Sequence, residues 1–344
     1  MSAHNGFAAH ERQLTRGAQV GWQPGMDMRN WFPVTATAGP AVGTATLAWR
    51  DMQNIAFTDS FVENTLMRQP REQRRVCLTP PQALDQFELG NALAPDAFIF
   101  HVSRCGSTLL TQLLASLPQA IVMSEPPIID SLLRMHHDQG GGDTVTLLRQ
   151  AMLAMGQRRT GTEGTYLIKF DCWHIHSLPL LRQAFPGTPC LFLYRQPHAV
   201  LASHQRRRGP QMVPGLIHPA LLPLPDRPVA AGDLDAFTAL VLDSLFTAAH
   251  RHALAGELTL INYEQLPALL FSELLASLSI SCTPDQLDAM QMRSKFHSKY
   301  RDDAYSGDPQ PQQDGRLAQL AAPLAAHYQA LETLRLARCT SGCR

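Results

Sequence analysis

Residues 98–117 read FIFHVSRCGSTLLTQLLASL. The first residues are apolar or favour strands, and the leucines from Leu109 onward recur at helical spacing until Pro118. Between these two parts lies a short turn of small and polar residues, 103–108. The pattern predicts a strand, a tight turn and a helix. Such a turn points backbone N–H groups and the positive end of the helix dipole at one place, so it favours an anion, above all a phosphate.

The turn differs from a standard Walker A loop. It has one glycine, Gly106, and its cation, Arg104, precedes that glycine, whereas the Walker lysine directly follows its second glycine. Gly106 would still let a ligand approach the backbone closely. The alternative interpretation is an ordinary strand-to-helix connection in which Ser107 and Thr108 cap the helix.

Composition limits the classes of protein that the chain can belong to. Its 344 residues can bury a full α/β core with an appendage, and its 29 basic and 29 acidic residues leave no net charge to recruit nucleic acid. Apolar runs stay below the roughly 18 residues that a membrane span needs, and the first residues are polar. Seven cysteines, an odd number, argue against a disulfide framework. We therefore expect a soluble, cytoplasmic protein with no transmembrane span and no nucleic-acid partner.

The chain divides into three parts by composition. Residues 1–95 hold three of the four tryptophans and are interrupted by Gly and Pro, so we interpret them as an N-terminal extension that packs on the main domain. A strand at 44–49 and a helix near 57–67 are expected there, with no catalytic constellation. Residues 96–305 form the predicted nucleotide-binding domain. Residues 306–344 read as a mobile linker followed by a C-terminal helix.

The strand predicted at 98–102 is called the anchor strand below. Four more short apolar runs follow it, each separated from the next by a helical pattern. They predict strands at 120–123, 166–170, 190–194 and 258–261. The fold class expected is therefore α/β: a three-layer, P-loop-like domain with a mostly parallel five-stranded sheet and right-handed crossovers. We expect the 120–123 strand to neighbour the anchor strand. Six prolines between 210 and 228 predict a long irregular loop, of the kind that forms a lid or substrate wall.

Polar side chains follow these predicted strands, at the edge where open α/β sheets place their ligands. Glu125 follows the second strand and could instead cap the next helix. Lys169 lies at the end of the third strand and should have an anionic partner, because an unpaired buried lysine is costly. His174 comes soon after, and a helix-start or surface histidine is its alternative interpretation.

Arg195 and Ser203 lie at the end of the fourth strand and in the helix that follows it. Their spacing corresponds to about two helical turns, so both can face one ligand. A cluster of cations at 293–301 includes Lys295 and Lys299. It is either a solvated surface or a second anion clamp.

Several segments, in this order, resemble the sulfotransferase family, whose members use 3′-phosphoadenosine 5′-phosphosulfate (PAPS). The resemblance covers residues 97–300 and rests on four stretches: SRCGSTLL at 103–110, SEP at 124–126, FP to YRQPHAVLAS at 185–203, and INYEQL at 261–266. It departs from the cytosolic members at two points. Their loop lysine is Arg104 here, and their Lys-Thr-His-Leu-Pro motif is matched only loosely by residues 169–179.

The resemblance, together with the positions of the residues in the sequence, suggests a role for each candidate residue. The 5′-phosphosulfate would be held by the loop residues Arg104, Cys105, Gly106, Ser107 and Thr108. The 3′-phosphate would be held by Arg195 and Ser203, with Lys295 and Lys299 as further cations. Arg104 and Lys169 would offset the charge that develops during transfer, without a metal. Glu125 is the first candidate for the general base and His174 the second.

The acceptor implied is a hydroxyl or amine of a small molecule, lipid or carbohydrate, and the nucleotide product is 3′,5′-diphosphoadenosine. Two other interpretations remain. The chain could be a P-loop kinase or NTPase with Asp171 as magnesium ligand, although the Gly-Lys pair is missing. It could also be a nucleotide-binding module without catalysis. The presence of a candidate general base, Glu125, argues against this interpretation.

Overall fold

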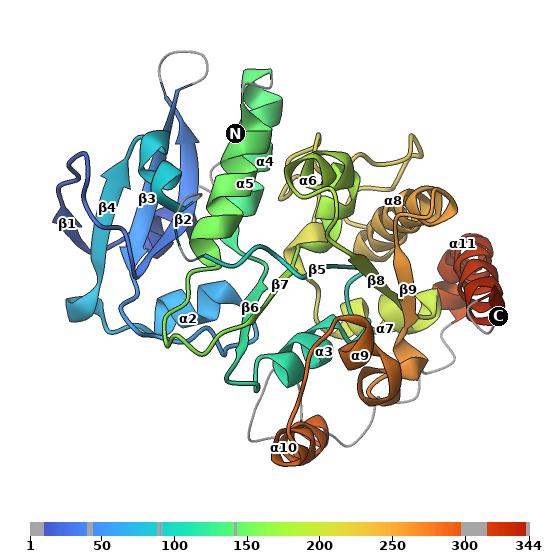
Figure 1. Cartoon of the computed structure of the whole chain (residues 1–344). Coiled ribbons are helices and arrows are strands. Elements are labelled where there is room, and N and C mark those ends of the chain that lie inside the picture. Colours follow the sequence, from blue (N-terminus) through green and yellow to red (C-terminus); the bar gives the residue numbers. More distant parts are fainter. Residues whose placement is uncertain are drawn as a thin grey trace. The chain divides into compact units, whose positions relative to one another are not determined.

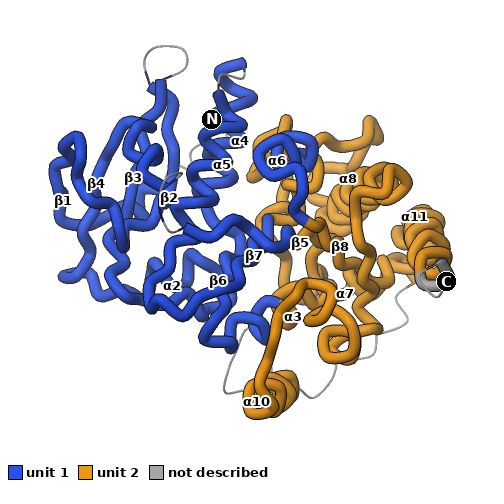
Figure 2. The backbone as a smooth tube through the Cα atoms, viewed as in Figure 1, with its two compact units in different colours: residues 1–98, 111–170, 177–188 blue, residues 99–110, 171–176, 189–344 orange. Residues whose placement is uncertain are grey.

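The structure is a computed structural model that describes residues 10–39, 44–87, 90, 92–140, 143–296 and 315–341 (Figure 1). The chain forms two compact units, drawn in different colours in Figure 2. The first unit comprises residues 1–98, 111–170 and 177–188, and the second comprises residues 99–110, 171–176 and 189–344. The domain boundaries expected at 95/96 and 305/306 stay a prediction.

A five-stranded sheet confirms the predicted α/β class. Its strands, in order, are β6 (Ala120–Ser124), β7 (Thr165–Lys169), β5 (Ala97–His101), β8 (Cys190–Tyr194) and β9 (Thr259–Asn262). All five are parallel, and each matches one of the five predicted strands. Every residue of β5, β7 and β8 is buried, as expected for strands covered on both faces.

One expectation about this sheet is wrong. The 120–123 strand does not neighbour the anchor strand, because β7 lies between β6 and β5. The pairing register places Ser124 of β6 beside Lys169 of β7. Apolar runs predict that strands exist, but their pattern carries no information on which parallel strands pair.

The N-terminal part of the first unit contains a second sheet that the sequence analysis largely missed. Its strands, in order, are β1 (Ala18–Val20), β4 (Arg75–Thr79), β3 (Ala45–Asp51) and β2 (Trp31–Ala38). Only β3 matches the strand expected at 44–49. β2 was hidden because Pro33 interrupts its pattern, and the pairing with β3 shifts register between Pro33 and Thr35. The expected helix near 57–67 is α2 (Val62–Arg68).

Helices α4 (Pro127–Gln139), α5 (Thr144–Met155) and α6 (Leu178–Ala184) also belong to the first unit. Proline occupies the first position of α4, and Gly140 ends it in the left-handed conformation. The Asp143 side chain caps α5 by accepting from Thr146 N. α4 and α5 both pack on β2, so the N-terminal sheet is part of this unit's core.

The second unit is mostly helical around β8 and β9. Helix α3 (Ser107–Leu114) begins in it, and its other helices are α7 (Pro197–Arg206), α8 (Leu234–Leu254), α9 (Leu275–Ser277), α10 (Pro284–Ser294) and α11 (Gly315–Ser341). The predicted C-terminal helix is α11, which packs on α7, α8 and β9. The expected linker at 306–314 lies outside the described residues.

Residues 210–228, all of which the structure describes, form the irregular loop that the prolines predict. Its regular structure is a single helical turn, η4 (Pro210–Met212). Across the described chain, no helix combines the length and the apolar character needed to cross a membrane.

Candidate functional site

The loop after β5 contains three residues in the left-handed conformation. The φ angles are 73° at Ser103, 50° at Arg104 and 81° at Gly106. For a residue other than glycine this conformation costs about 1–3 kcal/mol, and it persists only where the surroundings impose it. Backbone N–H groups in such turns form concave nests that bind anions, and α3 begins directly afterwards at Ser107. The loop therefore has the backbone shape of an anion site.

Neighbouring groups of the second unit hold this loop in place. Ser103 N donates to His101 Nδ1 at 2.9 Å, and Gln211 Nε2 donates to Ser103 Oγ at 3.1 Å. Cys105 Sγ is directed at Leu193 O, 3.2 Å away, and the Cys105 side chain is fully buried. Cys105 can therefore serve a ligand only through its backbone N–H. Gln211 also joins the start of the proline-rich loop, residues 210–228, to the loop after β5.

The Arg104 side chain reaches the end of α7. Its Nη2 donates to Arg207 O at 2.6 Å, and Arg207 N in turn donates to Ser203 O at 3.2 Å. A guanidinium at a helix C-terminus is stabilised by the negative end of the helix dipole. The structure thus connects two predicted site residues, Arg104 and Ser203, through Arg207.

Arg195 is joined to the same loop and to a residue that the sequence analysis did not select. Its Nη1 donates to Arg104 O at 3.5 Å, and its guanidinium carbon lies 4.1 Å from the centroid of the Tyr263 ring. Tyr263 also explains Gly106, because a Cβ at that position would lie 2.8 Å from Tyr263 Cδ2. The sequence did contain a signal for Tyr263. The stretch 261–266 contributed to the family resemblance, but none of its residues was included in the predicted site.

Helix α11 fixes the residues that precede Arg195 and Tyr263. Glu332 of α11 accepts hydrogen bonds from Tyr194 Oη and, at 2.9 Å, from Asn262 Nδ2. Arg335 Nη2 pairs with Glu332 at 2.7 Å. Burial alone would raise the pKa of Glu332, but the hydrogen bonds from Arg335, Tyr194 and Asn262 together hold it below its ordinary value. The ends of β8 and β9 are therefore tied to one ionised carboxylate.

In the first unit, Glu125 and Lys169 form a pair. Lys169 Nζ lies 2.8 Å from Glu125 Oε1, and Glu125 N donates to Lys169 O at 2.7 Å. The Lys169 side chain is fully buried and that of Glu125 is 23% exposed. Glu125 is left-handed, with φ 53°, directly after β6. The structure thus gives Lys169 the anionic partner that its burial requires.

His174, the second candidate base, belongs to the second unit and lies deeper. Its side chain is 1% exposed, and its Nδ1 lies 3.9 Å from Asp171 Oδ2. The Trp173 ring packs edge-on against it, with ring centroids 5.6 Å apart. A general base must come within hydrogen-bond reach of the acceptor, so the exposure of the two side chains favours Glu125.

Lys295 and Lys299 are the remaining predicted cations. Lys295 is an exposed residue at the end of α10, and its Nζ lies 3.6 Å from Met292 Sδ. Lys299 lies outside the described residues.

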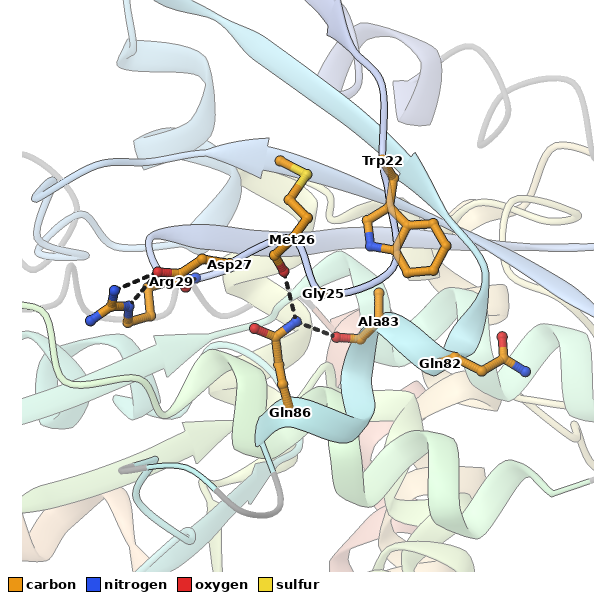
Figure 3. Close-up of a pocket in the computed structure, with 8 residues that line it drawn as sticks. All are labelled: Trp22, Gly25, Met26, Asp27, Arg29, Gln82, Ala83 and Gln86. Atoms are coloured by element: carbon orange, nitrogen blue, oxygen red, sulfur yellow. Dashed lines mark hydrogen bonds and ion pairs between the residues drawn. The ribbon is translucent and has the colours of Figure 1, made fainter.

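A polar pocket of about 420 Å³ lies in the first unit, and none of the predicted site residues lines it (Figure 3). Trp22 forms one wall. Among the other groups that line it, Asp27 pairs with Arg29 at 2.5 Å, and Gln86 Nε2 donates to Ala83 O at 3.0 Å. All the residues that line the pocket belong to the first unit.

Comparisons with known proteins find likeness only in the chain trace. No family model matches the chain, and no curated protein matches its sequence. The structure is similar to that of the sulfotransferase STF9 from Mycobacterium avium, with 12% identity and a TM-score of 0.47 over 73% of this chain and 78% of that one. It is also similar to the sulfotransferase domain of a Synechococcus olefin synthase, with 16% identity and a TM-score of 0.36 over 69% of this chain and 96% of that one.

Proposed function

We propose that the protein is a sulfotransferase that transfers a sulfonate group from PAPS to a hydroxyl or amine of a small-molecule, lipid or carbohydrate acceptor. The observation that carries this proposal is the connection between the left-handed turn at residues 103–106 and the guanidinium of Arg195 through Arg104 O. PAPS carries anionic groups at two ends, the 5′-phosphosulfate and the 3′-phosphate. A backbone nest beside a stacked guanidinium suits such a ligand better than it suits ATP.

The donor is proposed to bind in two parts. Backbone N–H groups of residues 104–108, together with the hydroxyls of Ser107 and Thr108, hold the 5′-phosphosulfate at the start of α3. Arg195 and Ser203 hold the 3′-phosphate. Support comes from the Tyr263 ring, because the Arg195 guanidinium carbon lies over it, 4.1 Å from the ring centroid, and this contact holds the cation beside the loop.

The chemistry balances with groups that the chain supplies. The acceptor oxygen or nitrogen attacks the sulfur, and the bond from sulfur to the bridging oxygen of the 5′-phosphate breaks. The electron pair stays on that oxygen, where the loop N–H groups and Arg104 stabilise the negative charge. Glu125 takes the proton that the acceptor loses. The products are the sulfonated acceptor and 3′,5′-diphosphoadenosine.

Incubation with donor labelled in the sulfonate group tests this function. The acceptor panel should contain phenols, aliphatic alcohols, sugars and amines, with the Glu125→Gln protein as matched control. We expect label to appear in one acceptor class together with an equal amount of 3′,5′-diphosphoadenosine, and the control to lose most of this transfer. Phosphoryl transfer from magnesium ATP, with no use of the labelled donor, would contradict the proposal.

A further inference from the structure

A short segment of the first unit, residues 57–61, places two aromatic rings on two cations of that unit. The Phe57 ring centroid lies 5.0 Å from Cζ of Arg159, and the Phe61 ring centroid lies 4.7 Å from Nζ of Lys169. Both distances are within the range of cation–π attraction. The sequence of this part of the chain shows no catalytic constellation.

The segment is held in place by contacts of two residues that lie between the rings. Thr58 O accepts from Gln112 Nε2 of α3 at 3.2 Å. Asp59 accepts from Thr65 Oγ1 at 2.8 Å and pairs with Arg68 at 3.0 Å, which ties it to α2. The chain between the two rings is therefore anchored to α2 and α3.

The two cations differ in one respect that matters for chemistry. Arg159 has no ion-pair partner among the described residues, and burial lowers its pKa to about 10. Lys169 has the Glu125 carboxylate at 2.8 Å. Besides this ion pair, its buried Nζ has no hydrogen-bond partner within the described part of the chain, so the carboxylate and the Phe61 ring are what offset its loss of water.

We propose that Phe61 is a positioning residue for Glu125, a role that rests on the proposed function of Glu125 as general base. The backbone of Glu125 is fixed by its N–H bond to Lys169 O, and its side chain is held by Lys169 Nζ. The Phe61 ring shields this ammonium from water and stabilises its charge. Without the ring, water would hydrate the ammonium and weaken the ion pair, so the carboxylate would lose its fixed orientation.

The chain provides a matched set of variants for a kinetic test. Phe61→Leu removes the π face but keeps an apolar side chain, and Phe61→Tyr keeps the π face. Phe57→Leu makes the same change at the ring that contacts Arg159, which has no ion-pair partner among the described residues. We expect Phe61→Leu to lower kcat about 10-fold, with the Kd for 3′,5′-diphosphoadenosine within about 2-fold of the wild type. Phe61→Tyr and Phe57→Leu should both stay within about 2-fold of the wild-type kcat.

A purely structural role would give a different pattern. Phe57→Leu would then lower kcat as much as Phe61→Leu, or the nucleotide Kd would weaken together with kcat. Either result overturns the proposal, as does a Phe61→Leu protein with wild-type kcat.

A thermal double-mutant cycle tests the contact without using activity. Phe61→Leu is combined with Lys169→Met, and Phe57→Leu with Lys169→Met serves as control. We expect the Tm changes of the Phe61 pair to depart from additivity by about 2 °C and those of the control pair to add. Additive changes in the Phe61 pair would overturn the inference, even if Glu125 proves to be the base.

The outcomes separate this inference from the proposed function. Coupling between Phe61 and Lys169 would confirm the contact. If Glu125→Gln nevertheless kept a normal kcat, Glu125 would not be the base, and the proposed mechanism would be wrong although the contact exists. If Lys169→Met does not fold, the ratio of kcat between Phe61→Leu and Phe61→Tyr tests the inference instead, because the two variants differ in the π face.

Discussion

The guanidinium carbon of Arg195 lies over the ring of Tyr263, 4.1 Å from the ring centroid. The two residues follow the ends of neighbouring strands, β8 and β9. The contact with the ring restricts the movement of the guanidinium before a ligand binds. This arrangement is the basis for assigning the 3′-phosphate to Arg195.

Replacement of Arg195 by alanine should weaken the binding of 3′,5′-diphosphoadenosine by about 2–4 kcal/mol, the loss expected for a charge-assisted contact in a partly closed site. The affinity for adenosine 5′-phosphosulfate, which has no 3′-phosphate, should barely change. Calorimetric titration of both ligands measures the difference. Equal losses for the two ligands would show that Arg195 does not bind the 3′-phosphate. Tyr263→Phe, which keeps the ring, is the control.

Replacement of Glu125 by glutamine keeps the size of the side chain and removes its basicity. We expect kcat to fall roughly 10²–10⁴-fold while the affinity for 3′,5′-diphosphoadenosine stays nearly unchanged. Steady-state kinetics with the acceptor found in the labelled-donor screen gives this ratio. Near-normal kcat in Glu125→Gln, with loss of kcat in His174→Ala, would move the base to the histidine.

Activity should survive EDTA. In the proposed mechanism, the loop N–H groups and Arg104 would supply the positive field that magnesium supplies in kinases. The rate of sulfonate transfer is compared before and after treatment with EDTA, with added magnesium as the control. Loss of activity on chelation and its return with magnesium would favour the kinase interpretation, with Asp171 as the metal ligand.

His176 should make the stability of the second unit depend on pH. Its Nε2 lies 3.0 Å from Ser244 Oγ, which itself donates to Pro223 O in the proline-rich loop. Burial, with smaller contributions from Arg251 and His252, lowers the pKa of His176 to about 4. In the unfolded chain the value is about 6.5. Between these values the unfolded state binds more protons, so the free energy of unfolding should rise from pH 4 to pH 6.5.

The His176→Gln protein isolates this contribution. Urea unfolding of both proteins at several values between pH 4 and pH 7 should show a steeper rise for the wild type, by on the order of 1–3 kcal/mol over the window. Parallel curves for the two proteins would show that His176 titrates equally in the folded and unfolded states.

Local sequence predicted the elements of the five-stranded sheet because each strand is a short apolar run that ends in a polar turn. It did not predict the order of the strands, because parallel strands pair with partners far away in the chain. The placement of β7 between β6 and β5 is such a case. The N-terminal sheet was missed for a related reason: Pro33 breaks the pattern of β2, and only tertiary pairing with β3 shows that a strand is present.

The candidate site shows the same limit. Burial of Lys169 predicted an anionic partner, since the cost of an unpaired buried charge is general, but nothing local identified Glu125 as that partner. Tyr263 was overlooked because its role comes from contacts with Arg195 and Gly106, which are distant in sequence. Phe61 was overlooked because its effect on Glu125 passes through Lys169.

The most direct test of the central claim is a calorimetric comparison of 3′,5′-diphosphoadenosine with ATP and magnesium on the full chain. We expect 3′,5′-diphosphoadenosine to bind without metal. Adenosine 5′-monophosphate, which lacks the 3′-phosphate, should bind at least about 30-fold more weakly, the equivalent of roughly 2 kcal/mol. Tighter binding of magnesium ATP than of 3′,5′-diphosphoadenosine would contradict the claim.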